Sequence, residues 1–248
     1  MSFITNLFKK NEDTQSANGF LSDNTPDTKL TEYKISLDKT VVNLQKSTGV
    51  SFDDLKSRVN LVLDYSGSMQ DMYMDGTVQE VITKILPLAL KFDDNGKLDC
   101  YLFSDNYIFN DSFKKIKGCT ERNYQNYVKD IIKPNGDNMR GTCYAPVIRD
   151  ILRHDTTDIP TFTIFITDGD NSDPAMTDDV VRQYSTANGF IMFIGIGGAE
   201  FRYLRKLDTL DGRPVDNTGF VEFVNIRKVN EAALYEKLLS EYASWLKR

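Results

Sequence analysis

Hard oxygen donors cluster in the stretch D-Y-S-G-S, where Asp64, Ser66 and Ser68 stand at two-residue spacing. Farther along the chain, Thr142 lies in R-G-T-C and Asp168 lies in T-D-G-D. Carboxylate and hydroxyl oxygens suit Mg²⁺ first, with Mn²⁺ or Ca²⁺ as alternatives, and they are poor ligands for Zn²⁺ and Cu²⁺. If the fold brings these five residues together, they predict a site for a divalent cation.

The elements that must position these residues are short apolar runs that alternate with amphipathic segments. The runs are rich in Val, Ile and Phe, as is typical of parallel strands buried on both faces. They cover 59–63, 98–103, 162–166, 190–194 and 220–224. Strands that alternate with helices predict a doubly wound α/β domain, with a mostly parallel sheet covered by helices on both faces.

Helical spacing of apolar residues predicts helices between and after the runs. They should cover 78–89, 124–132, 144–152, 177–187 and 234–245. Pro87 should kink or end the first of these helices, because proline has no N–H to donate. Residues 107–113 come soon after the second apolar run, and we expect them to form a short antiparallel strand at the sheet edge.

Ligands of doubly wound folds bind at the carboxyl ends of the strands. Asp64 and Asp168 each come at the end of an apolar run, and Thr142 comes just before a helix. Each hydroxyl taken alone is typical of a helix cap or a turn. Their joint placement on two strand ends and one helix start favours the metal site.

The first fifty residues predict two further segments. Residues 1–31 are polar, so burial cannot offset the entropy of ordering them, and we expect a flexible leader. Residues 32–50 alternate apolar and polar side chains in two short runs, which predicts a β hairpin or an edge extension of the sheet. The main domain should then span residues 52–248.

Composition and charge exclude several classes of function. The formal net charge of the 248 residues is -6, and the basic residues are dispersed, which argues against a nucleic-acid partner. No stretch reaches the roughly 18 apolar residues of a membrane span. The three cysteines have no CxxC spacing, which indicates reduced thiols in a cytoplasmic protein. The sequence makes no prediction of the oligomeric state.

The pattern D-x-S-x-S, a later threonine and T-D-G resembles the metal-ion-dependent adhesion site (MIDAS) of von Willebrand factor type A (vWA) domains. The resemblance covers about residues 52–248, and all five motif positions match. It implies a six-stranded sheet of order 3-2-1-4-5-6, in which Asp64 and Asp168 face each other across the site. It also implies that a carboxylate of a partner protein completes the coordination of the metal.

Two further stretches, 86–96 (L-P-L-A-L-K-F-D-D-N-G) and 140–147 (R-G-T-C-Y-A-P-V), resemble a narrower group. Together with K-I-S-L-D-K near the N-terminus, they are similar to the TerF-like branch associated with bacterial tellurium-resistance and stress genes. That resemblance implies a cytoplasmic bacterial protein, and it implies no defined chemical activity.

On these grounds we expect a non-enzymatic binding module that docks an acidic side chain of another protein through Mg²⁺. The metal ligands would be Asp64, Ser66, Ser68, Thr142 and Asp168. The rim around them, where the partner would bind, should comprise Tyr65, Met69, Gly141, Asp170 and Asp173.

Two alternatives stay open at the level of the sequence. D-Y-S-G-S also resembles the D-x-D-G-T loop of Mg²⁺-dependent phosphohydrolases, with Asp64 as the nucleophile. In that reading Ser66 occupies the position of the second acid, which would protonate the leaving group. The other alternative is a vWA domain whose site stays empty and which acts as a purely structural interaction domain.

Overall fold

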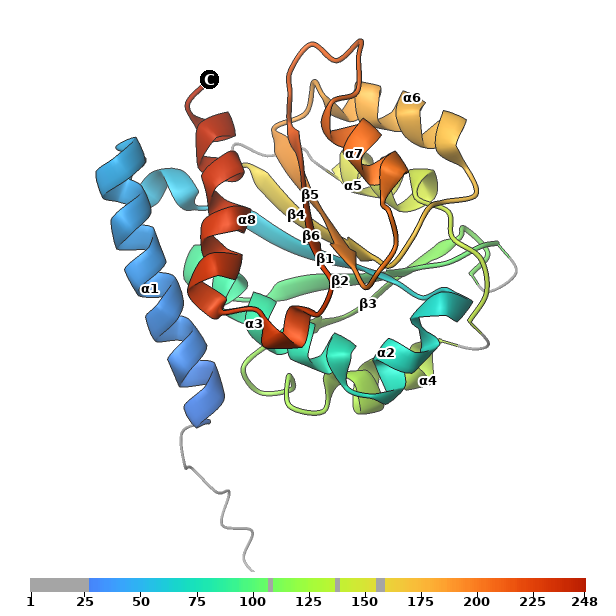
Figure 1. The fold of residues 1–248 in the computed structure, drawn as a ribbon, viewed down its shortest axis with the longest axis horizontal. Helices are drawn as coiled ribbons and strands as arrows, with labels where there is room; N and C mark the ends of the chain where they lie inside the picture. The colour runs from blue at the N-terminus through green and yellow to red at the C-terminus, as the bar shows by residue number, and fades with distance from the viewer. Residues whose placement is uncertain (1–26, 107–108, 137–138, 155–158) are drawn as a thin grey trace, which may run out of the picture.

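A six-stranded sheet in the order β3-β2-β1-β4-β5-β6 forms the centre of the computed structural model, which describes residues 27–106, 109–136, 139–154 and 159–248 (Figure 1). The strands are β1 (Arg58–Asp64), β2 (Leu98–Phe103), β3 (Phe113–Cys119), β4 (Thr161–Thr167), β5 (Gly189–Ile196) and β6 (Thr218–Phe223). Only β3 pairs antiparallel with its neighbour in this sheet. The predicted fold class and strand order are therefore confirmed.

The helices form a layer on each face of the sheet (Figure 1). One layer contains α3 (Thr77–Phe92), α8 (Glu231–Leu246) and, outside α8, α1 (Thr28–Thr48). The other layer contains α5 (Ala145–His154), α6 (Pro174–Tyr184) and α7 (Arg202–Asp208). The shorter helical elements are η1 (Asp53–Leu55), η2 (Gly67–Met69), α2 (Gln70–Met74), η3 (Val128–Ile132), α4 (Lys133–Asn135) and η4 (Ile226–Lys228).

Burial on both faces explains the continuous apolar runs of the central strands. Along β1, Leu61 and Leu63 contribute to the core beneath α3 and α8, whereas Val62 contributes to the core beneath α5 and α6. Successive side chains of a strand point to opposite faces, so both sets must be apolar. The four parallel central pairings then bring the carboxyl ends of five strands to the same edge of the sheet.

The antiparallel edge strand exists, but it lies farther along the chain than predicted. It covers Phe113–Cys119 instead of 107–113, and residues 107 and 108 lie outside the described part of the chain. Ser112 has a φ of 61°, so the backbone turns immediately before the strand. In the strand itself Ile116 and Cys119 are buried while lysines are exposed, which is usual for an edge strand that charged residues protect from further pairing.

The helix predicted at 124–132 is largely replaced by a turn and the short π-helical element η3. The reason is the side chain of Gln79 on α3. Its amide nitrogen donates to the carbonyl oxygen of Tyr124 at 2.5 Å, and its amide oxygen accepts from the N–H of Val128 at 3.1 Å. These are the two backbone groups that an α-helix would join directly, so a side chain distant in sequence takes the place of a helical hydrogen bond.

Pro87 does not end α3, which continues to Phe92. Proline removes one backbone donor from the helix. Near that interruption the carbonyl oxygen of Lys84 accepts a hydrogen bond from the hydroxyl of Tyr235 on α8, at 2.8 Å. The carbonyl that loses its helical donor at Pro87 is that of Thr83, so this contact joins α3 to α8 beside the proline and does not replace the missing bond.

The predicted hairpin at 32–50 is wrong, because residues 32–48 belong to helix α1. Asp27 accepts hydrogen bonds from the N–H groups of Lys29 and Leu30 at its start, and Gly49 ends it with a φ of 73°. The buried face, at spacings of three and four residues, comprises Leu30, Tyr33, Leu37, Val41 and Leu44. This face packs against α8 and α3, as the two neighbouring helices in Figure 1 show. Of the predicted leader, residues 1–26 lie outside the described residues.

None of the helices in the described ranges is long and apolar enough to cross a lipid bilayer.

Paired substitutions in α1 test the helix against the hairpin. Leu37 is 1% exposed and Ile35 is 48% exposed, so Leu37→Ala should lower the free energy of unfolding by about 2–5 kcal/mol. Ile35→Ala should change it by no more than about 0.5 kcal/mol. Urea unfolding measures both values. In a hairpin the two side chains would share one face, so similar losses for both variants would contradict the helix.

Candidate metal centre

Three loops meet at the carboxyl edge of the sheet, and we call them loops A, B and C. Loop A (64–69) follows β1, loop B (140–144) precedes α5, and loop C (167–173) connects β4 to α6. Loops A and C lie side by side because β1 pairs in parallel with β4, with Leu63 opposite Ile166. This pairing places two strand ends next to each other, although they are about one hundred residues apart in the sequence.

Side-chain hydrogen bonds connect four of the five predicted metal ligands. In loop A the hydroxyl oxygens of Ser66 and Ser68 are 3.1 Å apart, and the Ser66 N–H donates to Oδ1 of Asp64 at 2.8 Å. Across the two loops, the Ser68 hydroxyl donates to Oδ1 of Asp168 at 2.9 Å. Asp64, Ser66, Ser68 and Asp168 therefore form one continuous cluster of oxygen atoms.

Thr142, the fifth predicted ligand, lies in loop B, which backbone hydrogen bonds join to the other two loops. Loop B joins loop A through the N–H of Gly67, which donates to the carbonyl oxygen of Arg140 at 2.7 Å. It joins loop C through the N–H of Ser172, which donates to the carbonyl oxygen of Thr142 at 2.7 Å. Thr142 thus lies in the loop that is bonded to both of the others.

The electrostatics of the cluster fit a bound cation. Asp64 is fully buried, and this burial raises the pKa of its carboxyl group to about 7, with a further contribution from the charge of Asp168. Burial also raises the pKa of Asp168. Within the described ranges no ion pair joins either carboxylate to a basic side chain. A buried carboxylate without a counter-charge is costly, and a divalent cation would supply that charge.

The donor set is rich in hydroxyl groups and poor in acids. Among the described residues, no group of three or more His, Cys, Asp or Glu side chains could hold a metal ion. The two carboxylates of the cluster are instead accompanied by serine and threonine oxygens, which suits a hard cation and not a soft one.

The rim prediction is wrong for three residues. Met69 is fully buried in the core, and Tyr65 is 6% exposed, with its ring 5.3 Å from that of Tyr73. Asp173 is also buried, and its two carboxylate oxygens accept the N–H groups of Tyr144 and Ala145, each at 2.9 Å. These side chains are used for packing and capping, so they present little surface to a partner.

The remaining two rim residues have accessible surface. Asp170 is exposed, and Gly141 is partly exposed. A side chain on Gly141 would place its Cβ 2.9 Å from Oδ2 of Asp105, which also accepts the N–H of Gly141 at 3.1 Å. Glycine therefore allows loop B to approach Asp105 closely.

Two residues of the centre were not identified from the sequence as contributors to it, namely Thr167 and Tyr144, and Asp173 was expected at the rim and not as a helix cap. Thr167 donates its hydroxyl hydrogen to Oδ2 of Asp64 at 2.6 Å, and the Tyr144 hydroxyl lies 3.0 Å from the Thr167 oxygen. The position of Thr167 directly before Asp168 was a usable signal. No local pattern indicates that Asp173 caps a helix that begins 28 residues earlier in the chain.

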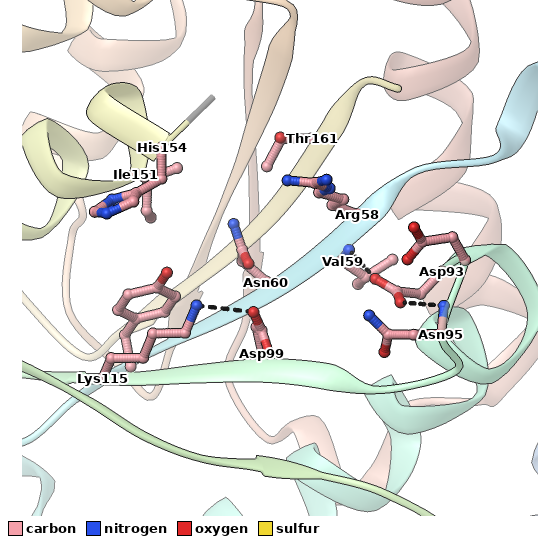
Figure 2. Close-up of a pocket in the computed structure, with 12 residues that line it drawn as sticks. Arg58, Val59, Asn60, Asp93, Asn95, Asp99, Lys115, Ile151, His154 and Thr161 are labelled. Carbon is pink, nitrogen blue, oxygen red and sulfur yellow. Dashed lines mark hydrogen bonds and ion pairs between the residues drawn. The ribbon is translucent and has the colours of Figure 1, made fainter. Parts of the chain in front are cut away.

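A separate pocket of about 220 Å³ lies at the opposite edge of the sheet, around the starts of β1 and β4 (Figure 2). Arg58, Asn60 and Thr161 line it from the strands, and His154 lines it from the end of α5. Lys115 donates to Oδ2 of Asp99 at 2.8 Å on its other side. Its lining combines basic and acidic groups, and none of the predicted metal ligands belongs to it.

The pH dependence of stability tests the buried carboxylate. The pKa of Asp64 is about 7 in the folded protein, and its ordinary value is 3.8. Between pH 3.8 and pH 7 the folded state therefore keeps a proton on Asp64 that the unfolded state releases. The free energy of unfolding of metal-free protein should therefore fall as pH rises through this window. Between pH 5 and pH 8, wild type should lose about 2–3 kcal/mol more than Asp64→Asn, by urea unfolding in chelator.

Asp71→Asn, which changes an exposed carboxylate of α2, is the matched control and should follow wild type. Parallel pH profiles for wild type and Asp64→Asn would contradict the assignment of a raised pKa to Asp64.

Comparison with known proteins defines the family. The sequence profile of the vWA-TerF-like family, described as the vWA domain found in the TerF C terminus, matches residues 56–248. The uncharacterized protein YcbR of Bacillus subtilis (strain 168) is 37% identical over 199 residues, which are 77% of this chain and 78% of that protein. The matched region contains the whole sheet, and α1 precedes it.

Solved structures share the fold at low sequence identity. The manganese-loaded Plasmodium vivax TRAP protein has a TM-score of 0.53 and 14% identity, over 77% of this chain and 74% of that chain. The N-terminal domain of TFIIH p34 has a TM-score of 0.51 and 11% identity, over 77% of this chain and all of that chain.

Proximal thread matrix protein 1 of the mussel byssus, solved with a zinc-occupied MIDAS motif, has a TM-score of 0.50 and 15% identity, over 74% of this chain. The present chain spans about half of the length of that protein, 48%. At these identities the similarity establishes the fold alone. The profile match and the 37% identical relative show that this chain belongs to the vWA-TerF-like family, a branch of the vWA domains, which are protein-interaction modules.

Proposed function

We propose that this protein is a metal-dependent interaction module, which docks an acidic side chain of a partner protein through a bound divalent cation. The metal ligands are Asp64, Ser66, Ser68, Thr142 and Asp168, acting directly or through water. The observation that carries this proposal is the continuous oxygen cluster beside a fully buried carboxylate that lacks a basic partner among the described residues.

The nature of the donors supports Mg²⁺ as the resident metal, with Mn²⁺ or Ca²⁺ as alternatives. Two proteins of similar fold were solved with a divalent metal, manganese in the Plasmodium vivax protein and zinc in the mussel protein. Those structures support a divalent cation here without selecting one.

The count of charges supports an acidic partner. Three of the five ligands are neutral hydroxyl groups, so the protein supplies at most two negative charges to the cation. Five protein ligands also leave one position of an octahedral Mg²⁺ or Mn²⁺ ion free. An aspartate or glutamate of a partner is a hard oxygen donor with a negative charge, and therefore fits that position.

The environment of Asp64 supports binding over catalysis. A nucleophilic carboxylate must reach its substrate, whereas Asp64 is fully buried. Ser66 also stands where a phosphohydrolase would need a second acid. We therefore propose that the module is not an enzyme.

The family supports a biological setting for the module. Membership of the vWA-TerF-like family favours a role in bacterial tellurium resistance or a related stress response, in the cytoplasm. The partner in that setting would be another protein, with no nucleic acid involved.

Calorimetric titration with Mg²⁺ and Mn²⁺ tests the metal site. Wild type should bind, and Asp168→Ala should bind at least about tenfold more weakly, because it loses a charged ligand. Asp71→Ala removes an exposed acid of neighbouring α2 and should bind as wild type does. Equal heats for wild type and Asp168→Ala would contradict the site, and no binding by wild type would favour the structural alternative.

A pull-down from the native bacterium tests the docking function. A partner should be retained in Mg²⁺, be released by chelator, and be lost with Asp64→Ala. Changing the partner's contacting Asp or Glu to Asn or Gln should abolish its retention, because the amide carries no negative charge. Hydrolysis of a generic phosphate ester that is lost in Asp64→Asn and kept in Ser68→Ala would instead establish the phosphohydrolase.

A further inference from the structure

The side chain of Tyr144 occupies a fixed position between loops B and C. It is fully buried, and its ring lies edge-on to Phe103 at 5.4 Å and to Phe165 at 4.9 Å. Its hydroxyl oxygen lies 2.6 Å from the carbonyl oxygen of Gly169 and 3.0 Å from the hydroxyl oxygen of Thr167. Aromatic packing on two sides therefore holds this hydroxyl at the end of β4.

Thr167 connects Tyr144 to the buried carboxylate. Its hydroxyl is fully buried and lies 2.6 Å from Oδ2 of Asp64. An ionised carboxylate can only accept hydrogen bonds, so the Thr167 hydrogen must point toward Asp64. On its other side the Thr167 oxygen accepts from the Gly169 N–H, which is 3.3 Å away. The single hydrogen of the Tyr144 hydroxyl goes to the Gly169 carbonyl at 2.6 Å, so Tyr144 holds the residue that donates to Thr167. The hydrogen bond between Thr167 and Asp64 therefore runs from the hydroxyl to the carboxylate.

These contacts hold the carboxylate of Asp64 in one orientation. Oδ2 accepts from Thr167 and Oδ1 accepts from the backbone of Ser66, so rotation of the group would break two hydrogen bonds. Hydrogen bonds to ligating carboxylates orient them, and loss of such a partner commonly weakens metal binding 10- to 100-fold. The contacts also join all three loops, because Tyr144 lies in loop B and Thr167 in loop C.

We propose that Thr167 and Tyr144 are positioning residues of the metal centre, which set its affinity by orienting Asp64. This inference rests on the proposed function, since it requires that the centre binds a metal. Neither residue touches the metal or the partner. Thr167 acts through Asp64, and Tyr144 acts through Gly169, whose carbonyl it bonds and whose N–H donates to Thr167.

Substitutions at Thr167 test the first part of the proposal. Thr167→Val keeps the shape but removes the hydroxyl, and it should weaken Mn²⁺ binding about 10- to 100-fold in calorimetry. Thr167→Ser restores the hydroxyl and should bind within about threefold of wild type. Thr163→Val is the matched control, because Thr163 lies on the same face of β4 and is equally buried. It should leave Mn²⁺ affinity unchanged.

Tyr144→Phe tests the second part, since it keeps the aromatic packing and removes only the hydroxyl. Mn²⁺ binding should weaken about three- to tenfold, less than for Thr167→Val, because Thr167 still reaches Asp64. Tyr242→Phe is its control. Tyr242 is also fully buried, and its hydroxyl lies 2.6 Å from Ser57 Oγ, under α8 on the other face of the sheet.

The outcomes separate this inference from the function on which it rests. If wild type does not bind Mn²⁺, both the proposed function and the positioning role are wrong. If wild type binds and Thr167→Val stays within about twofold, or Thr163→Val loses as much as Thr167→Val, only the positioning role is wrong. Failure of Thr167→Ser to restore binding would likewise overturn it, because the hydroxyl would then not be the group that matters.

Discussion

The parallel pairing of β1 with β4 is the interaction on which the metal centre depends. It brings the ends of two strands together, so that Ser68 bonds to Asp168 and Thr167 bonds to Asp64. Neither contact is available within one loop. The helices on both faces bury these strands, and this burial gives the carboxyl edge the rigidity that a set of oxygen ligands requires.

The same burial makes the centre costly without a metal. Asp64 is fully buried, which raises its pKa to about 7, and the hydrogen bonds from Ser66 and Thr167 offset only part of this cost. A buried carboxylate of this kind is a destabilising element of the fold that a cation can compensate. Under the proposed function, stability and metal binding would therefore be coupled through one side chain.

Helix α1 covers a second buried charge, the ammonium group of Lys84 on α3. Beneath it Lys84 is 1% exposed, donates to the carbonyl oxygens of Ile226 and Val229, and lies 3.2 Å from Glu231. Tyr33 of α1 lies over this lysine, with the charge 5.8 Å from the ring centre. The charge of Lys84 is thus paired and hydrogen-bonded, as a buried charge must be.

The sequence by itself determined the strand runs, the doubly wound class and, through the MIDAS pattern, the strand order and the candidate ligands, because apolar periodicity and motif spacing are local properties of the chain. Tertiary structure decided the rest. Packing on α8 made residues 28–48 a helix, although Tyr33, Ile35 and Leu37 alternate with polar residues as in a strand, because the face at helical spacing is the one that is buried. Gln79 interrupted the helix expected at 124–132. Tertiary packing also buries Met69 in the core and places the carboxylate of Asp173 at the start of α5. Each depends on atoms distant in sequence, which local patterns do not encode.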